Sequence, residues 1–197
     1  PTKIYGAENF EKFSGGIIIS NHYASAADGS IIFNAFFKNY FNALVKEEAF
    51  KTKIGNWFLT GVGCIPVKRG EADIDAYKKV VTVLKNGENI LIFPEGTRNK
   101  TDDLMLPFKK GVSVFAMRTK VEILPTLYFR MHRPFRKNIL VVGEPIDLLK
   151  EGFDRKQDAE ATEFLYEKMQ ALRVKANEIA KERGLKQYPP RKVKAKK

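Results

Sequence analysis

The sequence is poor in the residues that form covalent cross-links and metal sites: its 197 residues include one cysteine and two histidines. The single cysteine, Cys64, excludes an internal disulfide framework and fits a reducing compartment. These three residues are too few for a zinc site with Cys and His ligands. Stability must therefore come from an apolar core, and 44% hydrophobic residues suffice for one domain of this length.

Long apolar runs are also absent. A helix that spans a bilayer needs about 20 consecutive apolar residues, and no stretch approaches that length. The first fifteen residues mix Lys3, Glu8, Glu11 and Lys12 with isolated apolar residues, which excludes a secretory signal peptide. Pro1 follows either a removed methionine or a cut in a longer chain, which leaves open a membrane anchor upstream of it.

Acidic residues are outnumbered, 23 against 35 Lys and Arg, which gives a net charge of +12. More than half of this excess lies in the last seventeen residues. We therefore divide the chain into a domain, residues 1–183, and a basic tail, residues 184–197. The tail is either a solvated end or a contact with an anionic partner such as an acidic membrane surface. A nucleic acid partner is disfavoured, because Tyr188 is the only aromatic residue in the tail for base stacking.

Short apolar runs alternate with helical patterns, which predicts a single α/β domain with a mostly parallel or mixed central sheet flanked by helices. The runs are apolar throughout, as in strands that are covered on both faces. The expected strands are Gly16 to Ser20, Ala43 to Lys46, Cys64 to Val67, Asn89 to Phe93, Ile123 to Phe129 and Asn138 to Val142.

Three helices are expected. The first, Gly29 to Phe41, is apolar over most of its surface, so it lies either in the core or partly against a membrane. The second, Ala72 to Asn86, places Ile74, Tyr77, Val81 and Leu84 on one face. The third, Asp158 to Arg183, has a narrow apolar seam that docks either on the domain or on a partner.

Polar residues that could act in catalysis or in ligand binding follow three of the strands. His22 comes directly after the first, and Asp28 follows at the expected start of a helix. A histidine can accept a proton near neutral pH, and a carboxylate on its other ring nitrogen would orient it. The alternative is that Asp28 caps the helix and that the histidine is satisfied within a turn.

The other two segments are cationic. Lys68 and Arg69 end the strand that contains Cys64, and Cys64 itself is expected to be packed within that strand. The segment from Phe93 to Arg98 combines a proline–glycine turn with a carboxylate and a guanidinium, and a guanidinium suits a phosphate. Lys109 adds a second cationic loop. Because no enzyme nucleophile is evident, this set suits direct transfer, in which His22 deprotonates a hydroxyl that attacks an acyl thioester.

The motifs resemble those of the glycerol-phosphate and lysophosphatidic acid acyltransferase family. Asn21-His22 with Asp28 is similar to its NH-x4-D signature, and Gly63 to Arg69 to its second motif. Phe93 to Arg98 reproduces its FPEGTR motif residue for residue. Ile123 to Thr126, around Pro125, is similar to its fourth motif. The resemblance covers about residues 4–148.

The resemblance implies a catalytic group of His22 as general base, Asp28 as its partner, and Glu95. It implies that Arg69 and Arg98 bind the acceptor phosphate and that Glu95 and Gly96 shape that site. The full set of implied substrate-binding residues is Asn21, Arg69, Gly96, Thr97, Arg98, Lys109 and Pro125. The family uses no metal or other cofactor, and its acyl donor is acyl-CoA or acyl-carrier protein.

By this resemblance we expect sn-2 acylation of 1-acylglycerol-3-phosphate to phosphatidic acid, by a protein bound peripherally at the cytoplasmic face of a membrane. Acylation of glycerol-3-phosphate or another lysolipid is an alternative, and so is a non-catalytic protein that binds anionic membranes through the same scaffold. One departure bears on the dyad: five residues separate His22 from Asp28, where the family has four. The loop must absorb the extra residue, and Ser25 is an alternative hydrogen-bonding partner for the histidine.

Overall fold

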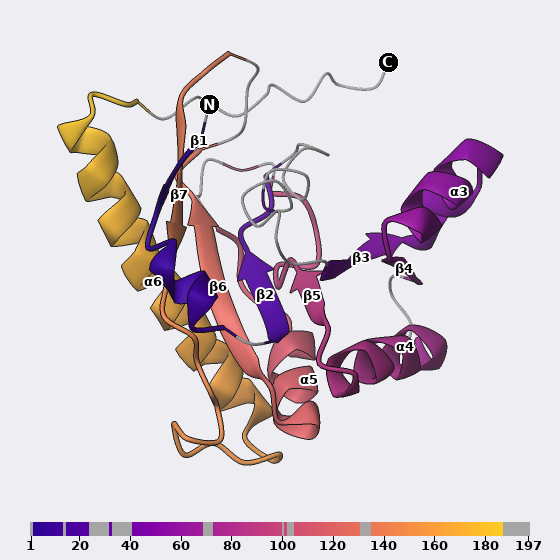
Figure 1. Ribbon diagram of the computed structural model, residues 1–197. Coiled ribbons are helices and arrows are strands. Elements are labelled where there is room, and N and C mark those ends of the chain that lie inside the picture. Colours follow the sequence, from indigo (N-terminus) through magenta and orange to yellow (C-terminus); the bar gives the residue numbers. More distant parts are fainter. Residues whose placement is uncertain are drawn as a thin grey trace.

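A seven-stranded mixed sheet forms the centre of the molecule, with strand order β1-β7-β6-β2-β5-β3-β4 (Figure 1). The computed structural model describes residues 2–13, 15–23, 32, 41–68, 73–99, 101, 105–130 and 135–186. The strands are β1 Thr2–Tyr5, β2 Gly16–Ser20, β3 Phe41–Lys46, β4 Cys64–Val67, β5 Asn89–Ile92, β6 Glu122–Tyr128 and β7 Asn138–Val142. All six expected strands are confirmed to within two residues at their ends, and β1 is an addition to them.

The helices of the described residues are α1 Glu8–Glu11, the 3₁₀ helix η1 Glu47–Phe50, α3 Lys53–Gly61, α4 Ile74–Lys85, α5 Gly111–Thr119 and α6 Asp158–Glu182. None of these described helices is long and apolar enough to cross a membrane. The helix expected from Gly29 to Phe41 lies almost wholly outside the described residues. Within it, Ile32 is helical and buried, whereas Phe41 is the first residue of β3.

Five neighbouring strands, β2 to β6 in chain order, run in the same direction, and the pair β1 and β7 runs the opposite way. Both faces of the sheet are covered, which explains why the strands are apolar throughout. In β2, Ile17 and Ile19 pack on the side of α4, α5 and α6, whereas Ile18 packs on the other side with Phe10 and Phe13 of the α1 region.

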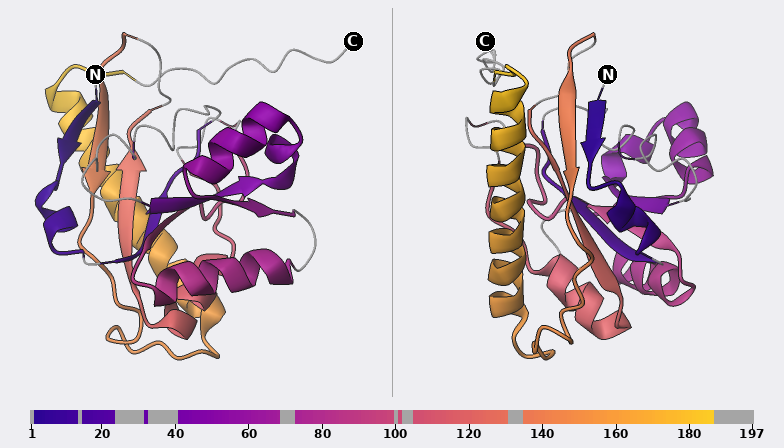
Figure 2. Two further views of the ribbon diagram at one scale, coloured as in Figure 1. Left: turned by 45° about the vertical axis from the view of Figure 1, so that its right-hand side comes forward. Right: turned by 60° about the vertical axis from the view of Figure 1, so that its left-hand side comes forward.

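Helix α6 packs along β6 and β7, and Figure 2 (right) shows it running over one face of the sheet. Leu165, Met169 and Ala176 are fully buried there, and Leu172 and Ile179 pack against the same core. The apolar seam expected on this helix therefore docks on the domain itself. The described chain continues to Lys186, and Leu185 still packs against this core.

The buried face of α4 differs from the expected one. Ala76, Val80 and Leu84 are buried, whereas Ile74 is 64% exposed. Tyr77 lies at the margin, where its ring stacks on Phe115 of α5 with 5.3 Å between centroids. The apolar residues of α4 form one broad side of the helix, and packing against β4 and β5 buries the part of that side centred on Val80 rather than the part near Ile74.

Asp73 begins α4 by accepting a hydrogen bond from the backbone amide of Ala76 (2.9 Å), and its second oxygen accepts one from Lys68 (2.8 Å). These two bonds lower the pKa of Asp73 below its ordinary value of 3.8. Because the folded pKa is depressed, the cap stabilises the fold above that ordinary value and is lost as the pH falls through the folded pKa.

Candidate active site

His22 lies two residues beyond the end of β2, at the edge where the parallel strands β2 and β5 both end. Such an edge is where ligands bind in α/β sheets. Asn21, the residue before it, is fully buried, and its side-chain amide donates to the carbonyl of Tyr128 and accepts from the amide of the same residue. Asn21 therefore fastens the end of β2 to the end of β6, which positions the histidine.

The segment that follows β5 surrounds His22 with three contacts. The ring of Phe93 stacks on the imidazole, with centroids 4.1 Å apart and an interplanar angle of 18°. The carboxylate of Glu95 accepts a hydrogen bond from the backbone amide of His22 (2.7 Å). The backbone amide of Asn99 donates to the His22 carbonyl (2.8 Å). The FPEGTR segment and the histidine thus form one unit.

Glu95 is 2% exposed and lies between two loops. One carboxylate oxygen takes the amide of His22, and the other takes the amide of Leu106 (3.0 Å). A buried carboxylate is costly unless hydrogen bonds replace its hydration, and both oxygens have such bonds here. Glu95, which is predicted to belong to the catalytic group, thus holds the loop that contains His22 and the loop that contains Leu106 in place.

Gly96 forms the turn that presents the cations. Its φ of +64° lies in the left-handed region that favours glycine, and its amide bonds back to the Phe93 carbonyl (3.0 Å). A Cβ at this position would lie 2.8 Å from Cδ of Lys109, so the lysine side chain crosses directly over the turn. Thr97 and Arg98 follow and are exposed. The exposed guanidinium and the Lys109 ammonium are therefore presented by adjacent loops.

Three predicted site residues remain: Asp28, Arg69 and Pro125. Asp28 and Arg69 lie outside the described residues. Pro125 is buried in β6, paired in register with Ile19 of β2. A Cβ on Gly143 would lie 2.8 Å from Pro125 Cγ and 3.2 Å from Leu172 of α6. Pro125 thus belongs to the packed interface between the sheet and α6.

The thiol of Cys64 is half-buried, and burial raises its pKa above the ordinary 9.0. A thiol with a raised pKa is protonated at neutral pH and is a weak nucleophile. This agrees with a structural role for the cysteine.

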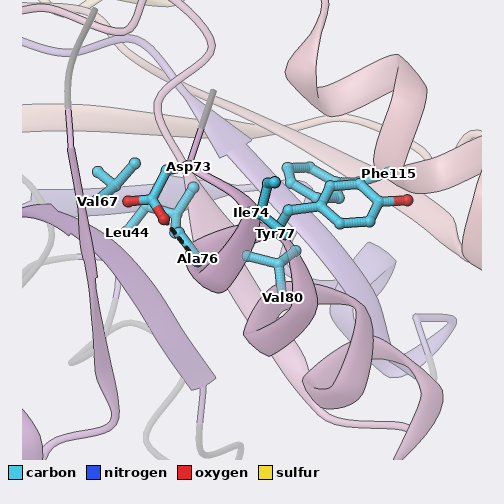
Figure 3. A pocket seen from close by; sticks show the side chains of 8 residues that line it. All are labelled: Leu44, Val67, Asp73, Ile74, Ala76, Tyr77, Val80 and Phe115. Carbon is cyan, nitrogen blue, oxygen red and sulfur yellow. Dashed lines mark hydrogen bonds between the residues drawn. The ribbon is translucent and has the colours of Figure 1, made fainter. Parts of the chain in front are cut away.

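An apolar cavity of about 330 Å³ lies between β3, β4, α4 and α5 (Figure 3). Its wall includes Leu44 and Val67, which belong to the core on the α4 side of the sheet. Phe93, the stacking partner of His22, belongs to the core on the other side. The cavity and the histidine site therefore lie on opposite faces of the sheet.

Chemically, the described site offers one imidazole and two exposed cations at a strand edge. The imidazole can take a proton from a hydroxyl, and the cations can bind a phosphate. The sequence did not indicate Asn99 or the amide of Leu106 as parts of this unit. The contact of Asn99 with His22 could have been expected, because Asn99 directly follows the FPEGTR segment. The contact of Leu106 with Glu95 could not, because it depends on how a separate loop folds back.

Glu95→Gln should destabilise the protein, because the amide group would place an N–H against one of the two backbone donors. A buried donor left without an acceptor costs about 1–3 kcal/mol. We expect the free energy of unfolding, measured with urea and circular dichroism, to fall by that amount. Thr97→Ala, an exposed change two residues away, should alter it by less than about 0.5 kcal/mol. Equal unfolding free energies for Glu95→Gln and the unsubstituted protein would contradict the proposed role of the carboxylate.

Comparison with known proteins gives concordant results. The family model "Acyltransferase" matches residues 1–128. The 1-acyl-sn-glycerol-3-phosphate acyltransferase of Borreliella burgdorferi is 36% identical over 139 residues, which are 70% of this chain and 54% of that protein. The enzyme of the same name from Bacillus subtilis is 29% identical over 149 residues, 73% of each chain. The chain thus spans about half to three quarters of the length of these two relatives.

A solved structure agrees with the sequence relatives. The 1-acyl-sn-glycerophosphate (LPA) acyltransferase PlsC of Thermotoga maritima superposes with a TM-score of 0.68 and 26% sequence identity, covering 90% of this chain and 71% of that one. The matched family model spans both the His22 segment and the FPEGTR segment, which the structure joins into one unit. Sequence, fold and site geometry lead to the same conclusion: this chain belongs to the acyltransferase family.

Proposed function

We propose that this protein transfers a fatty acyl chain from acyl-CoA or acyl-carrier protein to the sn-2 hydroxyl of 1-acylglycerol-3-phosphate, giving phosphatidic acid. The names of the related enzymes support this acceptor. The observation that carries the proposal is the unit in which Phe93 stacks on His22 while Glu95 and Asn99 each hold its backbone by one hydrogen bond. That unit places a proton acceptor beside an exposed, cationic turn.

In the proposed mechanism, His22 removes the proton from the acceptor hydroxyl as its oxygen attacks the thioester carbonyl. The tetrahedral intermediate collapses by breaking the carbon–sulfur bond, and the departing thiolate takes the proton from the imidazolium. No covalent bond to the enzyme forms. Asp28 would orient the imidazole and stabilise its cation, as the family resemblance implies.

The acceptor phosphate would be held by Arg98 and Lys109, together with Arg69. Arg98 presents a planar fork of donors that suits a phosphate, and it is only one residue from the Asn99–His22 hydrogen bond. Phosphate binding at this turn would therefore bring the sn-2 hydroxyl of the acceptor toward His22. The Glu95 carboxylate would support the site by holding the backbone amides of His22 and Leu106.

His22→Phe is the sharpest test of the base, because it keeps an aromatic ring to stack on Phe93 but has no proton acceptor. General-base catalysis supplies roughly 10²–10⁴-fold, so kcat for acyl transfer should fall by about that factor while the melting temperature is unchanged. His132→Ala, which removes the other histidine, serves as the matched control and should keep near-normal turnover. A His22→Phe enzyme with undiminished kcat would exclude histidine catalysis.

Arg98→Ala should raise the KM of the acceptor much more than the KM of the donor. A charged hydrogen bond is worth about 1.5–3 kcal/mol, which corresponds to roughly a 10- to 100-fold change. Arg98→Lys should recover only part of the lost acceptor binding, because an ammonium group lacks the planar fork of donors. Lys85→Ala removes an exposed charge in the last turn of α4 and should leave both constants unchanged. Unaltered acceptor KM in Arg98→Ala would place the phosphate elsewhere.

A further inference from the structure

Helix α3 carries a cluster of exposed apolar side chains on one face. Ile54 is 81% exposed, Trp57 78% and Phe58 58%. Their spacing of three and four residues places them side by side on the helix surface. All nine residues of α3 are described, and none of them is buried. A helix with these residues at its surface therefore presents a contiguous apolar face to its surroundings.

The opposite side of α3 rests on the domain. The helix packs against η1 and β4, and a Cβ on Gly55 would lie 2.7 Å from the Ala49 carbonyl oxygen. Thr52 caps the helix by accepting a hydrogen bond from the Gly55 amide (3.0 Å). The Gly55 side of α3 is thus packed on the domain, and this packing turns the face with Ile54, Trp57 and Phe58 outward.

This clustering is specific to α3. Seven large apolar residues are exposed in the described part of the chain, and three of them belong to this helix. The other four are Ile74, Phe135, Leu149 and Val174, which are well separated along the chain. Single exposed apolar residues are ordinary, whereas a contiguous patch marks a binding surface.

The chemistry of the patch suits a lipid surface. Tryptophan and phenylalanine favour the boundary between headgroups and acyl chains, and exposed lysines beside them can reach anionic headgroups. Lys51 and Lys53 are exposed at the N-terminal end of α3, and the helix itself contains no acidic residue. Glu47 and Glu48 of η1 oppose these charges locally, so we expect the apolar side chains to supply most of the binding at α3.

The position of α3 places the patch on the side of the sheet that carries the histidine. Figure 2 (left) shows α3 and α4 on opposite sides of β3 and β4. Helix α4 covers the face to which Leu44 and Ile65 point, whereas Phe93, stacked on His22, points to the other face. A surface that binds α3 therefore lies on the same side as the proposed base.

We propose that α3 is an interfacial helix that inserts Ile54, Trp57 and Phe58 into the outer part of an anionic lipid leaflet. The choice of lipid as the partner rests on the proposed function, because a lysolipid acceptor resides in such a leaflet. The patch lies on a helix at the periphery of the fold, as Figure 1 shows. Insertion would hold the His22 side of the domain against the surface that supplies the acceptor and receives the product.

The intact chain provides its own reporter, because Trp57 is its only tryptophan. Vesicles of phosphatidylcholine with phosphatidylglycerol should shift the Trp57 emission to shorter wavelength, and brominated acyl chains in those vesicles should quench it. At about 1 M salt, where the Debye length is about 3 Å, contributions from the basic tail and other surface charges are suppressed. At this salt concentration we expect vesicle binding to be weaker, but to persist because the apolar side chains of α3 still insert.

The double substitution Ile54→Ser with Phe58→Ser keeps Trp57 and should reduce high-salt vesicle binding about tenfold or more. Val174→Ser, on a 57% exposed position of α6, is the matched control and should bind like the unsubstituted protein. Turnover on a short-chain, water-soluble acceptor should be the same in both variants. That activity fails only if the proposed function fails, so the two hypotheses are tested separately.

Three outcomes would overturn the proposal. The first is vesicle binding without a shift or quenching of Trp57 emission. The second is a double variant that binds at high salt like the unsubstituted protein. The third is a dimer of the unsubstituted chain, seen by analytical ultracentrifugation without lipid, that the double variant dissociates, because the patch would then be covered by a second copy.

Discussion

Glu95 accepts backbone hydrogen bonds from His22 and from Leu106, two residues in segments that are far apart in the sequence. The carboxylate is buried, so its loss of hydration has to be offset by these two donors, and both loops must stay in place for that to hold. The same short segment stacks Phe93 on the imidazole and leads to the turn at Gly96. The position of His22 and the position of the cationic turn are therefore not independent.

Buried and exposed residues of the site differ in what they contact. Residues that are buried hold the backbone: Asn21 fastens β2 to β6, and Glu95 joins the loops. The residues proposed to contact the substrate, His22 and Arg98, are partly exposed and exposed. Direct acyl transfer suits this arrangement, because it asks the protein to orient two substrates and to move one proton. It also needs no enzyme nucleophile, and burial makes the thiol of Cys64 a poor one.

Much of the fold could be predicted from the sequence, because strands covered on both faces are recognisable as uninterrupted apolar runs. The sequence also placed His22 and the FPEGTR segment each at the end of a strand, and the structure brings them together because β2 and β5 are parallel neighbours. Helix α5 was not predicted: it begins with Gly111 and contains valines and a serine, so packing rather than local preference makes it helical. The buried face of α4 was predicted only in part, because its apolar residues form a side broader than the stripe that packs on the sheet.

The site was predicted less completely than the fold. The sequence indicated which residues carry charge, but not which charges are already bound within the protein. Glu95 stays a predicted member of the catalytic group, and the structure adds that its two oxygens accept hydrogen bonds from the backbone of other segments. Such partners depend on the tertiary path of the loop around Leu106. Pro125 stays a predicted binding residue, and the structure shows it buried in β6, in register with Ile19 of β2.

The central claim, direct acyl transfer to a phosphorylated acceptor, is tested most directly by mass spectrometry of products and of the intact protein. The protein would be incubated with an acyl thioester, first alone and then with 1-acylglycerol-3-phosphate, glycerol-3-phosphate or 1-acylglycerophosphocholine. The account predicts phosphatidic acid acylated at the sn-2 position as the main product and an unmodified protein mass with the thioester alone. A stable acyl adduct on the protein that is consumed when acceptor is added, or no acyl transfer to any of the three acceptors, would contradict it.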